Sequence, residues 1–180
     1  AFAPDVAIVS QDEQLGTAHA VQQASEALAD FDGDVIVLYG DTPFIQEDTL
    51  RRMLDARQNG AGVVVLGFEA QIPGRYGRLV TDADGGLDAI VEAKDASPEQ
   101  LAITLCNSGV ICADRANLFT LIDAVGNDNA SGEYYLTDIV GLARAKGQTC
   151  AAITCTEAET MGVNSRADLA AADAAFQIRQ

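Results

Sequence analysis

The chain has 180 residues, which is enough for one domain with a sizeable buried core. Its 27 acidic residues against 11 basic ones give a formal net charge of −16, so we expect neither nucleic acid nor an anionic membrane surface as a partner. No apolar run reaches the roughly 18 residues of a membrane helix, and no positively charged and then apolar leader opens the sequence, which favours the cytoplasm.

A short strand and a helix are the first elements that the sequence predicts. Residues 6–9 are all apolar and are typical of a strand, and apolar side chains at helical spacing predict a helix over 18–29. Gly16 and Thr17 precede this helix, where a glycine lets another backbone approach and a threonine hydroxyl can cap the first turn. We therefore expect a phosphate or a base edge to bind there.

The next apolar run, residues 35–39, shows no polar alternation, which is typical of a strand covered on both faces. Asp41 follows it, at the carboxyl end of a strand, where open α/β sheets hold their ligands. A carboxylate at this place can bind a hard cation such as Mg²⁺, which in turn carries phosphate oxygens. The alternative is that Asp41 only caps the helix that begins near Gln46.

The middle of the chain changes from helix–strand alternation to short strands. A helix over 46–58 and a valine-rich strand over 62–69 predict βαβ units and a parallel sheet. Residues 78–80 and 87–91 flank a hairpin turn, and a long strand follows over 102–113. These three strands predict a small antiparallel insertion over one end of the sheet, forming a pocket wall.

The last third of the chain alternates again. We expect a helix over 114–122 with Asp114 as its N-cap, a helix that ends at Lys146 before Gly147, a strand over 150–154 and a last helix over 167–178. The four cysteines lack the close pairs of a zinc site and lie among apolar residues, so we expect buried thiols.

Seven ordered motifs resemble the pyrophosphorylase domain of bacterial N-acetylglucosamine-1-phosphate uridyltransferase. They are Gln14-Leu15-Gly16-Thr17-Ala18-His19-Ala20, Tyr39-Gly40-Asp41-Thr42-Pro43, Gly74-Arg75-Tyr76-Gly77-Arg78, Glu92-Ala93-Lys94-Asp95, Asn107-Ser108-Gly109, Gly132-Glu133-Tyr134-Tyr135-Leu136-Thr137-Asp138 and Gly162-Val163-Asn164-Ser165-Arg166. The resemblance runs from about residue 5 to the end and implies one partial nucleotide-diphospho-sugar transferase domain over residues 1–180. It implies an α/β, Rossmann-like sheet with helices on both faces and a small antiparallel insertion.

The reaction that this resemblance implies is nucleotidyl transfer, a step of peptidoglycan precursor synthesis. UTP and N-acetylglucosamine 1-phosphate give UDP-N-acetylglucosamine and pyrophosphate, with Mg²⁺ as the cofactor. In-line attack by the sugar phosphate needs positioning and charge neutralisation rather than a side-chain nucleophile.

The resemblance also assigns roles to residues. It places Gln11, Gly16 and Thr17 at the uracil and ribose, Tyr39 and Gly40 beside the nucleotide, Asp41 and Asn164 on the metal, and Gly77, Glu92, Asn107, Tyr135 and Thr137 around the amino sugar. Ordinary local roles stay open beside these: a turn for Gly77, a strand irregularity for Asn107, and caps or packing for Tyr135, Thr137 and Asn164.

The chain departs from the family pattern at its beginning. The family opens with a strand and a Leu-Ala-Ala-Gly-x-Gly-Thr-Arg-Met loop, and nothing in residues 1–14 matches them. The family's left-handed β-helix is absent as well. We therefore expect either a piece of a longer product or copies that associate through exposed sheet edges, with weak or no pyrophosphorylase activity.

Two other functions remain open. One is nucleotidyl transfer to another sugar 1-phosphate, because few residues set sugar choice. The other is a non-catalytic module that binds sugar nucleotides. A glycosyltransferase is disfavoured, because Asp82-Ala83-Asp84 lies in a hairpin turn rather than after a core strand.

Overall fold

β5 (Leu105–Asp114) is the central strand of a six-stranded sheet in the computed structural model, which describes residues 6–163 and 165–179. One edge of β5 pairs antiparallel with β2 (Val63–Glu69). The opposite edge pairs antiparallel with β1 (Asp34–Val37) along its carboxyl half and with β3 (Arg78–Thr81) along its amino half. Ala113 shows this arrangement directly, because it is opposite both Val35 and Val63.

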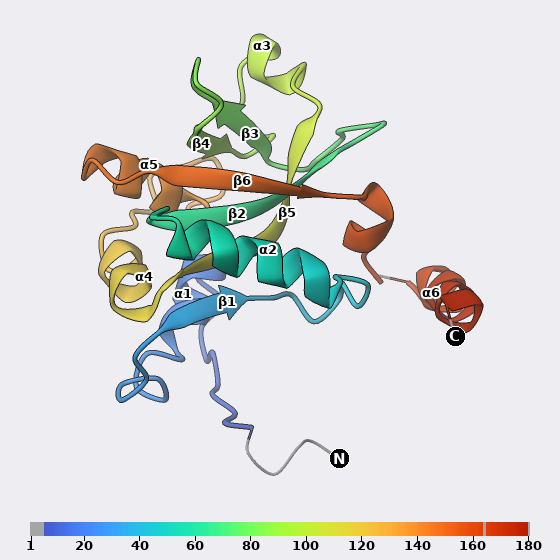
Figure 1. The fold of residues 1–180 in the computed structure, drawn as a ribbon, viewed down its shortest axis with the longest axis horizontal. Coiled ribbons are helices and arrows are strands. Elements are labelled where there is room, and N and C mark those ends of the chain that lie inside the picture. Colours follow the sequence, from blue (N-terminus) through green and yellow to red (C-terminus); the bar gives the residue numbers. More distant parts are fainter. Residues whose placement is uncertain (1–5, 164, 180) are drawn as a thin grey trace.

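Two further strands extend the sheet outward. β4 (Leu87–Val91) pairs antiparallel with β3, and β6 (Cys150–Cys155) pairs parallel with β2 (Figure 1). Among the described strands only β2 and β6 are parallel neighbours, so the predicted parallel sheet is wrong in its pairing. β1, β2, β3 and β6 do run in one direction, but β5 lies between β1 and β2 and runs against both.

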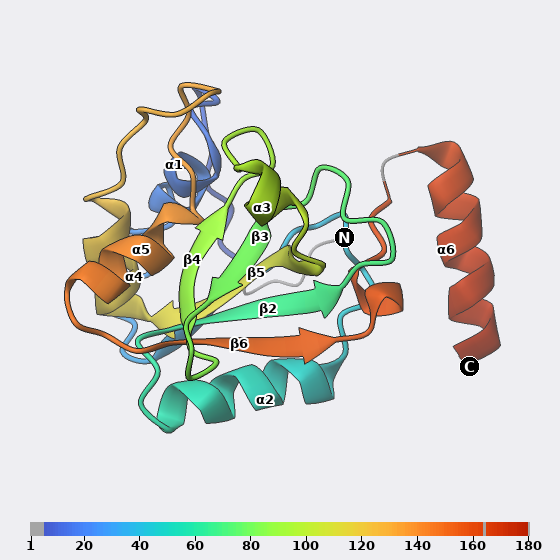
Figure 2. The same cartoon turned by 90° about the horizontal axis from the view of Figure 1, so that it is seen from above.

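Helices cover both faces of the sheet, as predicted. Successive residues of β2 point to opposite faces, so Val63 and Val65 pack in one layer and Val64 and Leu66 in the other. The first layer is covered by α1 (Thr17–Gln22), α4 (Arg115–Ile122) and α5 (Asp138–Ala145), and the second by α2 (Glu47–Gln58) (Figure 2). Burial on both faces explains the unbroken apolar run of β2.

Three shorter or outlying helical segments complete the fold. α3 (Pro98–Leu101) begins at Ser97, whose side chain accepts from Gln100 N in a capping box. A 3₁₀ helix, η1 (Glu157–Thr160), follows β6. α6 (Arg166–Arg179) stands beside the body of the domain in both views (Figures 1 and 2).

The fold confirms most predicted elements. The helices predicted over 46–58, 114–122 and 167–178 are α2, α4 and α6, and Asp114 caps α4 by accepting from Asn117 N at 3.0 Å. All four cysteines are free, and three of them are buried. The predicted hairpin is β3–β4, but it continues the sheet beside β5 instead of lying over its end.

Three predictions for the first 40 residues are wrong. Residues 6–9 form no strand, and Ile8 is 74% exposed, because no described strand lies alongside them. The helix expected over 18–29 ends at Gln22 and continues as tight turns, whose bonds run mostly from residue i+3 to residue i. The strand expected from the apolar run 35–39 ends at Val37; its side chains do pack into both layers, Val35 and Val37 into one and Ile36 into the other, but β1 is only half-buried because no described strand lies on its other edge.

No helix in the described part of the chain is both long enough and apolar enough to cross a membrane.

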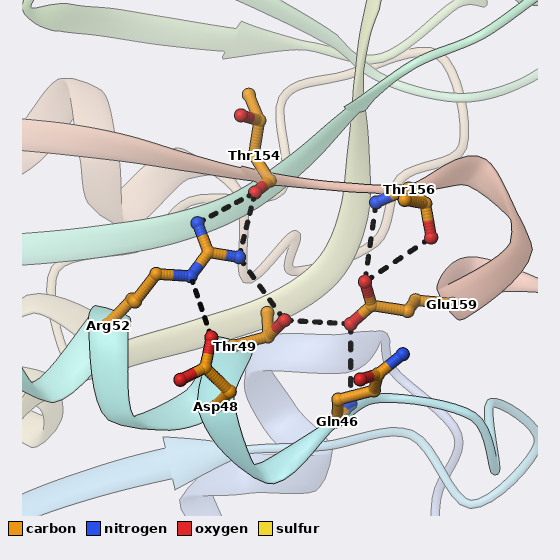
Figure 3. Close-up of polar contacts among 7 residues, drawn as sticks. All are labelled: Gln46, Asp48, Thr49, Arg52, Thr154, Thr156 and Glu159. Atoms are coloured by element: carbon orange, nitrogen blue, oxygen red, sulfur yellow. Dashed lines mark hydrogen bonds and ion pairs between the residues drawn. The ribbon is translucent and has the colours of Figure 1, made fainter.

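Glu159 joins η1 to the beginning of α2 and is 5% exposed (Figure 3). Its Oε2 accepts from Thr49 Oγ1 at 2.7 Å and from Gln46 N at 3.3 Å, and its Oε1 accepts from the backbone and hydroxyl of Thr156. Burial alone would raise the pKa of this carboxyl, but the hydrogen bonds from Thr49, Gln46 and Thr156 outweigh burial and lower the pKa.

Arg52 ties the same part of α2 to β6. Both terminal nitrogens of its guanidinium donate to Thr154 O at 3.1 Å, one of them also donates to Thr49 Oγ1, and its Nε lies 3.6 Å from Asp48 Oδ2 (Figure 3). The segment after β6 is thus held against α2 by charge-assisted hydrogen bonds, which are stronger than neutral ones.

We predict that Glu159→Gln lowers the free energy of unfolding by about 1–3 kcal/mol at pH 7, because either orientation of the amide turns its NH₂ group towards a backbone N–H, of Gln46 or of Thr156, which only donates. The contribution of a carboxylate with a lowered pKa is present above its unfolded pKa of about 4.3 and is lost as the pH falls through the folded value. The gap between wild type and variant should therefore shrink near pH 3 in urea unfolding.

The matched control is Glu157→Gln, an exposed position on the same 3₁₀ helix. It should leave the unfolding midpoint unchanged at both pH values. Equal effects of the two variants would contradict the role that we give to Glu159.

Candidate functional site

Tyr39 lies directly after β1, and its ring rests on the backbone of β5. Gly109 has φ +92°, and a Cβ there would overlap the Tyr39 ring. The Tyr39 hydroxyl hydrogen-bonds with the Thr17 side chain. Burial raises the pKa of Tyr39, and the nearby Glu92 and Asp41 carboxylates raise it further, so the phenol stays protonated at neutral pH.

Gly16 and Thr17, predicted on the nucleotide side, dock against the segment before α5. Gly16 has φ +122°, and a Cβ there would lie 2.5 Å from Tyr134 O. Ala18 N donates to Tyr134 O, and Tyr134 N donates to Leu15 O. Thr17 Oγ1 accepts from Leu136 N at 2.9 Å. The predicted cap is thus wrong: Gly16 is the N-cap of α1, and the Thr17 hydroxyl binds another segment.

Glu92 and Gly77, predicted at the amino sugar, do lie together. A Cβ on Gly77 would lie 3.4 Å from Glu92 Oε1, so the carboxylate covers the glycine backbone. Thr137 Oγ1 donates to Glu92 Oε1 at 3.1 Å. Burial raises the pKa of Glu92, and the Thr137 hydrogen bond partly opposes this.

Asn107 connects the same wall to β5. Its backbone N donates to Gly77 O at 2.8 Å, and its Oδ1 accepts from Gly109 N at 2.9 Å. The second bond supports the turn of the strand at Gly109, so the local role left open for Asn107 is present in the structure. The backbone of Asn107 thus contacts Gly77, and its side chain contacts Gly109, on which the Tyr39 ring packs.

A cavity of about 560 Å³ opens beside Glu92 and Tyr135. It is lined by Arg75, Glu92, Ala93, Lys94, Ser131, Glu133 and Tyr135. Lys94 Nζ donates to Ser131 Oγ at 3.0 Å, and Ala130 N donates to Asp95 Oδ1 at 3.0 Å, which fastens the loop over 127–133 across one side of the cavity. Its size suits one sugar ring with a phosphate.

A second cavity, of about 440 Å³, contains Asp41. It is lined by Tyr39, Asp41, Thr42, Tyr76, Ser108, Thr160, Gly162 and Asp168. Tyr39 lies between the two parts of the site, because its ring faces this cavity while its hydroxyl bonds to Thr17. Val163 N donates to Asp41 O at 2.8 Å, so the segment held by Glu159 continues directly onto the Asp41 turn.

Asp41 is exposed and does not cap α2, whose N-cap is Gln46. The capping alternative is therefore excluded. No group of three or more His, Cys, Asp or Glu side chains converges within the described residues. Mg²⁺ needs only one or two carboxylates when phosphates and waters supply the other oxygens, so Asp41 and Asp168 at one cavity fit such an ion. Asn164 lies outside the described residues.

The structure brings Gly77, Glu92 and Thr137 into contact, and it adds a connection that the sequence did not predict. Thr137 is the N-cap residue of α5 and forms no side-chain cap bond, since its hydroxyl donates to Glu92 instead. The segment 134–137 contacts Thr17 at one end and Glu92 at the other, so it joins the two predicted subsites. Gly40 is exposed beside Asp41, with open space where a Cβ would lie.

Several residues that line the site were not predicted from the sequence. They are Arg75, Ser131 and Glu133 in the first cavity and Tyr76, Thr160 and Asp168 in the second. A single side chain in a loop gives no periodic pattern, so only the positions of Arg75, Tyr76 and Glu133 inside the ordered motifs could have drawn attention to them.

We predict that Gly109→Ala lowers the free energy of unfolding by about 2–3 kcal/mol, since the new methyl group meets the Tyr39 ring at a backbone angle that favours glycine. Denaturant unfolding measures the loss. Gly126→Ala is the control, because nothing lies within 4 Å of a Cβ there and its φ is not positive. Similar midpoints for the two variants would contradict the packing of Tyr39 on Gly109.

Comparison with known proteins agrees with this arrangement. The chain is 64% identical over 179 residues to the bifunctional protein GlmU of Cereibacter sphaeroides, which covers 99% of this chain and 39% of that relative. The GlmU of Rhodospirillum rubrum is 60% identical over 173 residues, covering 95% of this chain and again 39% of the relative. The chain thus spans well under half the length of these relatives.

A solved structure shows the same fold at much lower identity. UDP-glucose pyrophosphorylase in complex with UDP-glucose superposes with a TM-score of 0.70 and 17% identity, covering 94% of this chain and 65% of that one. The model of the MobA-like NTP transferase domain matches residues 1–133. With nearly three quarters of its length matched, the chain belongs to the family of MobA-like NTP transferase domains.

Proposed function

We propose that this domain binds UTP and N-acetylglucosamine 1-phosphate and serves uridyl transfer between them, giving UDP-N-acetylglucosamine and pyrophosphate. One observation carries the choice of an amino-sugar phosphate: the Glu92 carboxylate covers Gly77 and is held there by Thr137, at the edge of a cavity of about 560 Å³. A fixed carboxylate suits sugar hydroxyl groups and an acetamido N–H, which all donate.

The nucleotide belongs on the other side of the segment 134–137 in this proposal. Gln11, Gly16 and Thr17 lie there, and Tyr39 links Thr17 to the Asp41 cavity. The two substrates would then share one wall, which brings the sugar phosphate oxygen towards the α-phosphorus. Positioning of this kind supplies much of the rate in phosphate transfer without a side-chain nucleophile.

Asp41, with Asp168 near it and Asn164 as a predicted further ligand, would hold Mg²⁺ at the triphosphate. When bound, the ion would neutralise phosphate charge in a domain that is itself strongly acidic. Lys94 and Arg75 are the cationic side chains of the first cavity and would face the phosphate of the sugar. Tyr39 would stay neutral and act as a hydrogen-bonding wall.

Calorimetry with UDP-N-acetylglucosamine in the presence of Mg²⁺ tests the proposal without depending on turnover. We expect binding by the wild type, at least tenfold weaker binding by Glu92→Gln because a donor replaces an acceptor, and a weaker Mg²⁺ dependence in Asp41→Asn. A pyrophosphate-release assay with UTP, N-acetylglucosamine 1-phosphate and Mg²⁺ measures turnover in the same samples.

Glu92→Gln also separates binding from folding. Because burial raises the pKa of Glu92, its charge opposes folding, and the stability linked to its protonated form is lost as the pH rises through the folded pKa. The variant should therefore be at least as stable as the wild type at pH 7 while binding worse. Asp88→Asn, on the exposed face of β4, serves as the control for binding. Undiminished binding by Glu92→Gln would refute the sugar site.

We propose a cytoplasmic location and self-association through sheet edges as further properties of this domain. β1 has no strand on its second edge among the described residues, and Leu38, which follows it directly, is an exposed apolar side chain. Such an edge pairs readily with another chain. Sedimentation velocity over a hundredfold range of concentration should show a rising sedimentation coefficient, and a constant monomer value would contradict the proposal.

A further inference from the structure

His19 lies between two glutamine side chains on the predicted nucleotide side of the domain. Its Nδ1 is 3.0 Å from Gln11 Nε2, and its Nε2 is 3.2 Å from Gln23 Nε2. His19 is the only histidine of the chain. A neutral imidazole has one nitrogen that donates and one that accepts, so it cannot accept hydrogen bonds from both amides.

Backbone carbonyls determine how both amides are turned. Gln11 Nε2 donates to Gly16 O at 3.2 Å, and Gln23 Nε2 donates to His19 O at 2.9 Å. A carbonyl oxygen only accepts, so the amide atom at each place must be the nitrogen. Both glutamines therefore point NH₂ groups at the imidazole, and the ring can accept from only one of them.

The two ways of resolving this conflict differ at Gln11. If Nδ1 accepts, the two hydrogens of Gln11 Nε2 bind His19 and Gly16 O, and Oε1 is left without a partner among the described residues. If Nε2 accepts from Gln23 instead, Nδ1 carries the proton and Gln11 can no longer donate to the ring. Gln11 then either keeps only its bond to Gly16 O or turns over, which would give up that bond and present an NH₂ group in place of the carbonyl.

Each arrangement keeps three of the four contacts of these amides, but the first keeps the shorter contact with the ring, 3.0 Å from Gln11 Nε2 to Nδ1 against 3.2 Å from Gln23 Nε2 to the ring Nε2. It requires the proton of the imidazole on Nε2. Gln23 then keeps its bond to His19 O at 2.9 Å and gives up its contact with the ring. His19 thus restrains Gln11 so that only a carbonyl oxygen remains available to a ligand.

We propose that His19 is a positioning residue that makes this site choose uracil over cytosine. The inference rests on the proposed function, in which Gln11 lies at the pyrimidine. Uracil carries a hydrogen on N3 and meets the Gln11 carbonyl with a donor, whereas N3 of cytosine is an acceptor and meets it with repulsion. Removing the restraint would let the Gln11 amide rotate and serve either base.

The tautomer of His19 can be measured on the wild-type protein without any ligand. Long-range ¹H–¹⁵N correlation spectra distinguish the two ring nitrogens, and a single histidine makes their assignment unambiguous. We expect the proton on Nε2 at a pH where the ring is neutral. A proton on Nδ1 would overturn the proposal, because His19 could then not accept from Gln11 and would not restrain it.

The second test compares the affinities for UTP and CTP, each with Mg²⁺, by calorimetry. We expect the preference for UTP to fall about tenfold in His19→Leu, which removes the acceptor, and to be retained in His19→Asn, whose side-chain oxygen can accept in place of Nδ1. Gln23→Ala, which removes only the competing donor, should keep or increase the preference.

The outcomes separate this inference from the function on which it rests. Binding of UDP-N-acetylglucosamine with an unchanged ratio of UTP to CTP affinity in His19→Leu refutes the role of His19 alone. Absence of UDP-N-acetylglucosamine and UTP binding in the wild type refutes the proposed function and, with it, the choice of base. A loss of preference in His19→Asn equal to that in His19→Leu would indicate a packing role and would also refute the inference.

Discussion

Pairing on both edges of β5 is the constraint on which the rest of the structure depends. This strand holds β2 on one side and both β1 and β3 on the other, and no other described strand has three neighbours. Its irregular centre, at Asn107 and Gly109, faces the shift in register of β2 between Val65 and Gly67. The break in the ladder is where the Tyr39 ring and the backbone of Gly77 reach β5, so the site forms at the point where the strand is least regular.

The segment 134–137 is the second organising element, because it gives a different hydrogen bond to each side of the site. Tyr134 and Leu136 bind the turn before α1, and Thr137 binds Glu92. The turn before α1 and the Glu92 carboxylate are therefore positioned by one short stretch of backbone. The hydrogen bonds of Glu159 position the Asp41 turn in a similar way. They hold the segment that leads to Val163, whose N donates to Asp41 O.

Burial and neighbouring carboxylates both disfavour the ionised form of acidic side chains in this site. Glu92 and Asp138 have raised pKa values, first because of burial and then because of neighbouring carboxylates, in a chain whose net charge is −16. Ionisation of these two carboxyl groups destabilises the folded state. Groups with perturbed pKa values of this kind cluster at functional sites. Glu159 shows the opposite pattern, since its hydrogen bonds lower its pKa and its ionised form supports the fold.

The sequence by itself determined the class of fold and the ends of most helices, and it singled out residues that the structure brings into contact. Periodicity located α2, an Asp at the right place located the cap of α4, and the ordered motifs grouped Gly77, Glu92 and Thr137, which do lie together. Only the tertiary structure decided that β1 pairs against β5 rather than inside a parallel sheet, and that residues 6–9 form no strand. The reason is physical, because a strand forms through hydrogen bonds to a neighbouring strand. The residues of one strand do not determine which strand that neighbour is. The same limit applies to His19, because its hydrogen-bonding role depends on which amide atoms of Gln11 and Gln23 lie next to its ring in the folded protein.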